Sequence, residues 1–342
     1  RVKSELHRCE DIGLLTINIL AAKAFLCFYE IGHGRYPVAY LTAGGCTRLA
    51  LTLGLHDTKR AVQLTLRPNG WTEIEERRRI WWAAVVIDSK CVSIGFRLRP
   101  MSIPKLPTRA FVPADDDRFD LGQPAVSPVL VMSINSVIQV TSYAQTCQVV
   151  NLLGPVVDHI NPSESNDPGI EYTYSEAMQL HRAATSLLTM VNDNYNMGDL
   201  RTKIRSSVPK ALLYTALINL FFYHCAIEGD SIDLGGEESG IRAEFQQLAL
   251  DNLGPLALDI LNFGQDLTTM FTEHGMSWLS PLVIDCIFQA SVYYAWRVRE
   301  ASEADSLEKL QALRSCLEIL KQRWKNAGEY LRMSEETEYE WK

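Results

Sequence analysis

The sequence lacks the short motifs that mark catalytic and metal centres. Its eight cysteines contain no C-x-x-C pair, and its seven histidines contain no H-E-x-x-H. There is no G-x-S-x-G, no glycine-rich loop ending in Gly-Lys-Ser/Thr, and no dinucleotide fingerprint. These absences remove the usual sequence evidence for hydrolases, nucleotide-binding enzymes and metalloenzymes. We therefore predict that the chain is not an enzyme and that it holds no cofactor of its own.

Positive charge is scarce as well. The chain has 33 Lys and Arg residues against 41 Asp and Glu residues, which gives a formal net charge of -8 at pH 7. Its longest basic run, Arg77–Arg79, spans less than one helical turn. Because binding to duplex DNA depends mainly on neutralising phosphates, this composition argues against a nucleic-acid-binding surface on this chain.

The cysteines are far apart in the sequence and lie within apolar runs. In a chain of 342 residues, this distribution favours reduced, buried thiols, as in cytosolic or nuclear proteins, over a disulfide framework. The chain begins with Arg1 instead of methionine. We expect it to be a fragment of a longer protein, with any targeting signal outside it.

Apolar residues in helical spacing are what the sequence has in quantity. Hydrophobic residues make up 47% of the chain and charged residues 22%, as in a folded globular protein. Strand-like alternation of useful length is missing, so we predict an all-α fold, a multi-helix bundle that forms a single large helical domain over residues 1–342. The apolar run Leu14–Tyr29 is predicted to be a buried helix, because Lys23 in its middle would cost about 2.5–3.5 kcal/mol in a bilayer.

The stretch Trp71–Pro100 is predicted to contain the central helix of the bundle. Thr72 and Glu75 have the spacing of a capping box, and Arg79 follows Glu75 at the four-residue distance of a favourable ion pair. Helical geometry places Glu75 on the polar side of this helix and Asp88 within a broad apolar arc. A buried carboxylate needs a partner. The sequence offers three basic candidates for Asp88, namely Arg48, Arg97 and Arg99.

Further helices are expected on both sides of this stretch. One is predicted from about Val38 to Leu53, ending at Gly54, with Leu55 placed for the hydrophobic contact of a glycine-type cap. Six prolines from Pro100 to Pro128 exclude a long helix there. Helical spacing returns at about residues 129–152, 173–195, 208–227, 241–271 with a break near Gly254 and Pro255, 279–300 and 305–333.

The last of these helices carries one apolar seam at alternating steps of three and four residues. Two interpretations stay open: a dimerising coiled coil, which would make the protein a homodimer, or the closing helix of the bundle. The seam lasts only about three heptads, which favours the closing helix. Its residues are Leu310, Leu313, Leu317, Leu320, Trp324, Ala327 and Leu331.

One acidic motif keeps an enzyme hypothesis open. Asp116, Asp117 and Asp120 have the D-D-x-x-D spacing with which helical isoprenoid enzymes hold Mg²⁺, an ion that prefers oxygen ligands. The motif lies in a proline-flanked loop, and the second Mg²⁺-binding motif of those enzymes is incomplete at Asn192–Asp193. A solvated acidic loop is therefore the favoured interpretation.

The order of several motifs resembles the middle regulatory region, or middle homology region, of fungal binuclear zinc-cluster transcription factors. These motifs are CTRLALTLGLHD at Cys46–Asp57, EERRRIWW at Glu75–Trp82, and a glycine followed by Arg-Pro after the central helix. The resemblance is best over about residues 12–110 and more general over the helical part at about 129–333. The residues that carry it are Leu53, Gly54, Leu55, His56, Glu76, Arg77, Arg78, Arg79, Trp81, Trp82, Asp88, Gly95, Arg99 and Pro100.

The resemblance implies a nuclear regulator of transcription. In that family a separate six-cysteine zinc module contacts DNA, so zinc is expected only in such a module, which this chain does not contain. The chain itself is then expected to modulate activation and to bind a small-molecule effector or a co-regulator protein. Two alternatives remain: the Mg²⁺-dependent isoprenoid enzyme, and a helical interaction scaffold without a ligand.

Overall fold

The computed structural model describes residues 1–95, 100–103, 106, 110–130, 141–161, 170–226, 236–301 and 304–339. These residues are mostly helical and form no sheet, which confirms the all-α prediction. Their contacts group them into two compact units. The N-terminal unit comprises Arg1–Ile31 and Arg35–Gly154, and the C-terminal unit comprises Gly32–Gly34 and Pro155–Lys342. This grouping does not test the prediction of a single domain, which stays a prediction.

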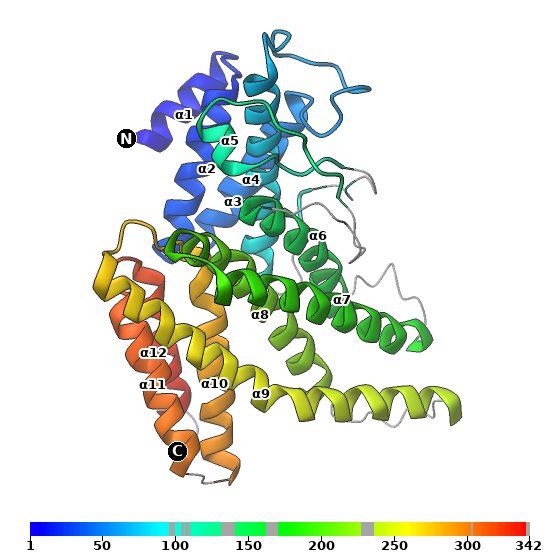
Figure 1. Cartoon of the computed structure of the whole chain (residues 1–342), viewed down its shortest axis with the longest axis vertical. Coiled ribbons are helices and arrows are strands. Elements are labelled where there is room, and N and C mark those ends of the chain that lie inside the picture. The colour runs from blue at the N-terminus through cyan, green and yellow to red at the C-terminus, as the bar shows by residue number, and fades with distance from the viewer. Residues whose placement is uncertain are drawn as a thin grey trace. The chain divides into compact units, whose positions relative to one another are not determined.

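The N-terminal unit is organised around α4, which packs against α3. Its elements are α1 (Val2–Asp11), α2 (Ile17–Gly32), α3 (Val38–Thr52), α4 (Trp71–Gly95), α5 (Asp116–Asp120) and the first part of α6 (Ser142–Ile160), as labelled in Figure 1. The predicted apolar helix is α2. Within the described part of the chain, none of the helices combines the length and the apolar character that crossing a bilayer requires.

The end of α3 confirms the predicted glycine cap. Gly54 has φ +79°, a left-handed conformation that glycine adopts without steric cost. Its N–H donates to the Leu51 carbonyl oxygen at 3.0 Å, and the Leu55 N–H donates to the Ala50 carbonyl oxygen at 3.1 Å. This pair of bonds defines a Schellman motif. Leu53 and Leu55 are both buried, so the cap also closes apolar packing around the helix end.

The start of α4 differs from the prediction. The helix begins at Trp71, and Glu73 reaches back to accept a hydrogen bond from the Asn69 N–H at 2.9 Å. The predicted capping box of Thr72 and Glu75 is therefore wrong. The physical reason is that partners from the proline-rich segment, Ala114 and Ser127, occupy the Glu75 carboxylate.

The proline-rich segment after α4 contains only the short α5 among its described residues, as predicted. Phe111 and Val129 form an isolated antiparallel bridge, with a hydrogen bond from the Val112 N–H to the Pro128 carbonyl oxygen at 2.9 Å. The predicted helical start at residue 129 is therefore wrong, because this backbone pairs across the segment. Residues 131–140 lie outside the described residues, and α6 runs from Ser142 to Ile160.

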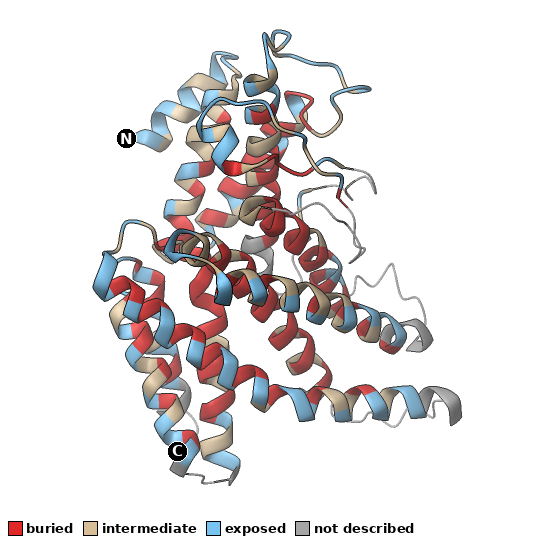
Figure 2. Ribbon diagram, in the orientation of Figure 1, coloured by how far each residue is buried: buried red, intermediate tan, exposed pale blue. Residues whose placement is uncertain are grey.

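The C-terminal unit consists of longer helices with buried faces, drawn in red in Figure 2. One expected feature is wrong: α9 continues through Gly254 and Pro255 without a break. Leu253, Leu256 and Ala257 are buried around this point, and their packing outweighs the loss of one backbone hydrogen bond at proline. The elements are α7 (Ile170–Met197), α8 (Leu200–Ala226), α9 (Gly236–His274), η2 (Pro281–Val283), α10 (Ile284–Ala301), α11 (Ala304–Leu320) and α12 (Lys325–Tyr339).

The predicted closing helix at 305–333 is also wrong, because two helices, α11 and α12, occupy it. The chain turns between Leu320 and Lys325, and Trp324 in this turn donates its indole N–H to the Leu279 carbonyl oxygen at 2.8 Å. The seam residues on α11 are buried, but they do not continue into one straight helix. The apolar spacing predicted the buried positions and missed the turn.

Candidate functional site

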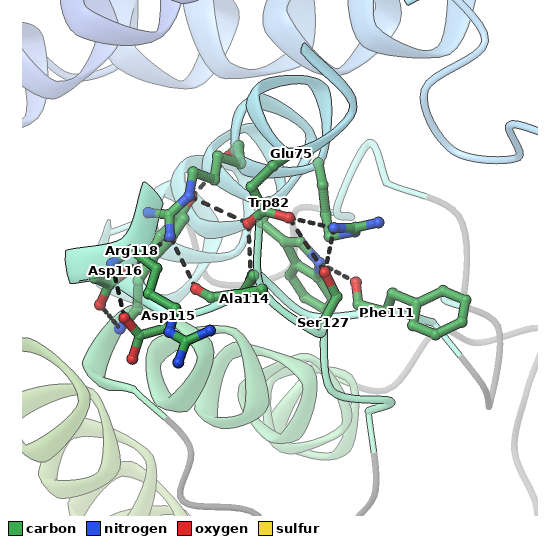
Figure 3. A network of polar contacts seen from close by, with 12 residues as sticks. Glu75, Trp82, Phe111, Ala114, Asp115, Asp116, Arg118 and Ser127 are labelled. Carbon is green, nitrogen blue, oxygen red and sulfur yellow. Dashed lines mark hydrogen bonds and ion pairs between the residues drawn. The ribbon is translucent and has the colours of Figure 1, made fainter. Parts of the chain in front are cut away.

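The carboxylate of Glu75 is the centre of a buried polar network on α4 (Figure 3). Glu75 is 0% exposed, although helical geometry placed it on the polar side of α4. Its Oε1 accepts from the Ala114 backbone N–H at 2.7 Å and from Arg79 Nε at 3.2 Å. Its Oε2 accepts from the Arg78 guanidinium and from the Ser127 hydroxyl, the latter at 3.3 Å. Both oxygens are therefore satisfied, partly by residues of the proline-rich segment.

Arg79 extends this network to α5 and α6. Its Nη2 lies 2.9 Å from the Ala114 carbonyl oxygen and 2.9 Å from Asp116 Oδ1. Its guanidinium also lies over the Phe119 ring, 4.2 Å from the centroid, where a cation is attracted to the aromatic face. The Tyr143 hydroxyl on α6 donates to the Arg79 carbonyl oxygen at 2.8 Å. One arginine thus connects three helices of the N-terminal unit.

The groups near this network are held in their neutral or paired forms. Burial raises the pKa of the Tyr143 hydroxyl well above its usual value, and the neighbouring Cys147 contributes in the same direction. Burial likewise raises the pKa of the Cys147 thiol well above its usual value. The phenol is therefore a hydrogen-bond donor, and the thiol is a poor nucleophile. This arrangement can hold a segment in place, and it is unsuited to acid-base or covalent catalysis.

The tryptophans of α4 hold the same segment from the apolar side. Trp82 is 0% exposed, and its indole N–H donates to the Phe111 carbonyl oxygen at 2.9 Å. Trp71 makes the equivalent contact, from its indole N–H to the Ala125 carbonyl oxygen at 3.0 Å. Trp81 is also buried and lies beside His56, with ring centroids 6.3 Å apart. The motif residues around the α3 cap and those of α4 are therefore neighbours.

In the described part of the chain, the partners of Asp88 are backbone amides. Asp88 is 0% exposed, and its Oδ2 accepts from the backbone N–H groups of Ser102 and Ile103, each at 2.8 Å. Burial raises the pKa of this carboxyl, and the two amides partly oppose that shift. Of the predicted partners, Arg48 is exposed. The prediction is therefore wrong for Arg48, and it stays a prediction for Arg97 and Arg99, which lie outside the described residues.

We expect Asp88→Asn to stay within about 1 kcal/mol of the parent free energy of unfolding, and Asp88→Ala to lose about 2–3 kcal/mol. An asparagine oxygen can still accept from both amides, whereas alanine leaves the N–H groups of Ser102 and Ile103 without this acceptor. Urea titration of both variants measures the difference. Equal losses in the two variants would contradict this account, because they would show that the charge of Asp88 matters more than its acceptor oxygen.

The remaining motif residues lie at the surface or at the ends of α4. Glu76 is exposed, and Arg77 donates to the Leu66 carbonyl oxygen at 2.6 Å. The Pro100 carbonyl oxygen accepts from the Tyr40 hydroxyl at 2.9 Å, and Gly95 is the last residue of α4. We call Glu75, Arg78, Arg79, Trp82 and Asp88 the α4 clamp, because each of them bonds to residues between 100 and 127.

The central position of Glu75 in the clamp was not predicted from the sequence. The spacing of Glu75 to Arg78 and Arg79, three and four residues away, was the available signal, since it brings both arginines to one carboxylate. The same spacing is typical of solvated ion pairs, so it did not indicate burial. The acceptors and donors at residues 111–127 have no pattern of their own, because most of them are backbone groups.

The acidic motif serves the fold and does not support the isoprenoid enzyme hypothesis. Asp116 is buried and paired with Arg79, and its Oδ2 accepts from the Tyr143 N–H at 3.3 Å. The Asp115 side chain caps α5 by accepting from the Arg118 N–H at 2.8 Å. Asp117 and Asp120 lie on the same short helix. Among the described residues, no group of three or more His, Cys, Asp or Glu side chains is placed to hold a metal ion.

A second polar cluster, in the C-terminal unit, joins two buried histidines. His159 Nε2 on α6 lies 2.9 Å from His224 Nε2 on α8, and His159 Nδ1 lies 2.9 Å from Glu176 Oε2 on α7. His224 is 0% exposed. Burial lowers the pKa of His224 to about 3, with a smaller contribution from the neighbouring His159. The folded protein therefore keeps His224 neutral.

The lowered pKa of His224 predicts that the folded protein loses stability in mild acid. The unfolded chain protonates this side chain below about pH 6.5, while the fold resists protonation down to about pH 3. Stability therefore falls as pH drops through this window, by about 2 kcal/mol between pH 7 and pH 5 for one such group. His224→Phe should remove that part of the loss in urea titrations at the two pH values. The exposed His274→Phe is the control, and an unchanged pH dependence in His224→Phe would disprove the assignment.

Comparison with known proteins finds that part of the N-terminal unit is similar to a known family. Residues 8–124 match the family described as the fungal specific transcription factor domain. This match confirms the resemblance to the middle region of fungal zinc-cluster regulators. It contains every residue of the α4 clamp, and two of their bonded partners, Ser127 and Tyr143, lie outside it. No solved structure matches the chain.

Three curated relatives are similar over part of their length. Transcription factor BOA15 of Botryotinia fuckeliana is 47% identical over 66 residues, 19% of this chain and 36% of the relative. An uncharacterized transcriptional regulatory protein of Schizosaccharomyces pombe is 30% identical over 35% of this chain and 18% of the relative. Transcription factor tazR of Aspergillus terreus is 28% identical over 39% of this chain and 21% of the relative. The chain thus spans about a third or less of these relatives, which are regulators of transcription and not enzymes.

Proposed function

Because residues 8–124 carry a fungal specific transcription factor domain, we propose that this chain is the regulatory region of a nuclear transcription factor. DNA is contacted by a separate zinc-cluster module, and this chain sets how strongly the protein activates transcription. The net charge of -8 supports this division of labour, because the phosphate backbone attracts basic surfaces. Zinc belongs to the separate module, and this chain responds to a small-molecule effector or a co-regulator protein.

The α4 clamp is the observation that carries this proposal. A buried ion cluster usually stabilises a fold less than apolar packing of the same volume does. The α4 clamp lies within the family match, and a functional role would explain why it is there. In this role the clamp has two arrangements: in one, Glu75 is bonded to Ala114 and Ser127, and in the other these groups are released. An effector that binds one arrangement more tightly then shifts the balance between silent and active forms.

A reporter assay tests the switch. The chain is joined to an unrelated DNA-binding module and an activation segment, and the output of the parent is compared with that of Arg79→Lys. Lysine keeps the charge but loses the planar fork that contacts Glu75, Ala114 and Asp116 together. We expect the reporter output of Arg79→Lys to differ from that of the parent. A higher output would show that the released arrangement is the active one, and a lower output that the bonded arrangement is. Circular dichroism and melting temperature establish that both fusions are folded.

Arg77→Lys is the matched control for this assay. It is the same substitution two residues earlier in α4. The described bond of Arg77 is to the Leu66 carbonyl oxygen, and a lysine ammonium can also donate to that oxygen. Output of this variant is expected to equal that of the parent. Equal output of Arg79→Lys and the parent under every nutrient condition tried would eliminate the switch and leave a scaffold role. Tight binding of the folded, isolated chain to duplex DNA at physiological salt would contradict the proposal that a separate module contacts DNA.

A further inference from the structure

The first helix of the N-terminal unit, α1, is attached without a core contact of its own. None of its residues is buried, and in Figure 2 it is drawn in the colours of exposed and intermediate residues. Most helices of a globular protein are held by an apolar face that packs into the core. The attachment of α1 must therefore depend on other contacts.

Two ion pairs with matching spacing supply the attachment. Lys3 Nζ lies 3.2 Å from Glu30 Oε1 and donates to the Thr42 hydroxyl at 3.2 Å. Lys23 Nζ donates to Glu10 Oε1 at 2.5 Å. On each helix the two charged residues are seven positions apart, about 10.5 Å along the axis. Because the early residue of α1 meets the late residue of α2, the two helices run antiparallel with complementary charge patterns.

The charged groups under α1 do not prevent its release. The side chain of Glu30 is 1% exposed and that of Lys23 is 12% exposed while α1 is in place. Each of them makes its described ion pair with a residue of α1, and we infer that release of α1 opens both to water and does not strand them in the core. The α1 side of each pair is partly open to solvent, with Lys3 42% and Glu10 25% exposed, so salt screens both pairs in part. Gly13, at φ +73° and with no atom within 4 Å of its Cβ position, gives the connection to α2 an open turn.

We propose that α1 is a detachable strap over a helix-docking face of α2, and that a partner helix with a lysine and a glutamate in the same seven-residue spacing takes its place. The docking face is defined by Lys23 and Glu30 on α2 and by Thr42 on the neighbouring α3. Charge complementarity specifies the partner, because an antiparallel helix must bring its lysine to Glu30 and its glutamate to Lys23. This property is separate from the α4 clamp, whose bonds run from α4 to residues between 100 and 127.

Hydrogen exchange on the intact chain tests whether α1 detaches. Glu10→Lys places two positive charges together and should speed exchange of the α1 amides about fivefold or more, with α4 unchanged. Adding Lys23→Glu reverses both charges and should restore the parent rate. Glu5→Lys is the matched control, because Glu5 pairs with Arg8 on α1 itself. The strap is disproved if Glu5→Lys has the same effect, if the double variant stays fast, or if faster exchange spreads to α4.

A peptide tests the docking face. Residues 2–11 are prepared with a helix staple between positions 4 and 8, both of which are exposed, so that the face with Lys3 and Glu10 is free. The labelled peptide is expected to bind the Glu10→Lys chain more tightly than the parent, in which α1 competes for the same face. A stapled peptide that itself carries Glu10→Lys should not bind the Glu10→Lys chain. Equal binding of the two peptides, or equal binding to the two chains, would overturn the proposal of a helix-docking face.

Discussion

Glu75→Ala is expected to lower the free energy of unfolding by about 3–5 kcal/mol, as for other variants that remove one partner of a buried ion pair. The substitution removes the acceptor of two arginines and also leaves the Ala114 N–H without its acceptor at 2.7 Å. Arg78 can turn toward water, because its side chain is 19% exposed. The Ala114 N–H cannot, because Ala114 is 0% exposed.

The neighbouring Glu76→Ala is the control for this measurement. Glu76 has the same side chain on the same helix but is exposed, so its loss should change stability by less than about 0.5 kcal/mol. Denaturant titration of both variants at one pH compares them directly. If Glu76→Ala cost as much as Glu75→Ala, the loss would reflect the helix and not the buried network, and the α4 clamp would not be a main source of stability.

Trp82→Ala is expected to cost a similar amount, about 3–5 kcal/mol, for a different reason. Trp82 is fully buried, so alanine leaves a cavity in the core beside α4. The indole also donates to the Phe111 carbonyl oxygen at 2.9 Å. Trp82→Phe separates the two contributions, because it fills most of the space and loses only the hydrogen bond, which is worth about 1 kcal/mol.

The melting temperature and the urea midpoint of these variants provide the test. Trp296→Ala serves as the control, since Trp296 is 38% exposed and its loss leaves a smaller cavity. A Trp82→Phe variant as unstable as Trp82→Ala would contradict the cavity argument. It would show that the bond to Phe111, and therefore the position of the proline-rich segment, determines most of the effect.

The sequence predicted those parts of the fold that depend on local physics. The cap at Gly54 could be predicted because a left-handed residue after a helix is most easily glycine. A long helix in Trp71–Pro100 and the burial of Trp81 and Trp82 followed from helical spacing. The absence of a long helix between Pro100 and Pro128, in the part of that segment the structure describes, followed from proline chemistry alone. Each of these needs information from only a few neighbouring residues.

The errors all involve partners that are distant in sequence. Glu75 belongs to the polar side of α4 by periodicity, and only Ala114 and Ser127 explain its burial. The described partners of Asp88 are backbone amides, which every residue except proline carries and which no sequence pattern reveals. The continuity of α9 through Pro255 and the turn at Trp324 depend on surrounding packing in the same way. Local propensity is therefore overridden where tertiary contacts are strongest.

The bonds of Glu75 also have a consequence for the order in which the protein is made. Ala114 and Ser127 follow Glu75 by 39 and 52 residues. At a synthesis rate of about 5–20 residues per second, Ser127 is added about 3–10 s after Glu75. During that interval the chain holds the residues of α4 without the segment that bonds to Glu75 and Trp82 in the folded protein. The central helix is therefore made before the residues that complete its packing exist.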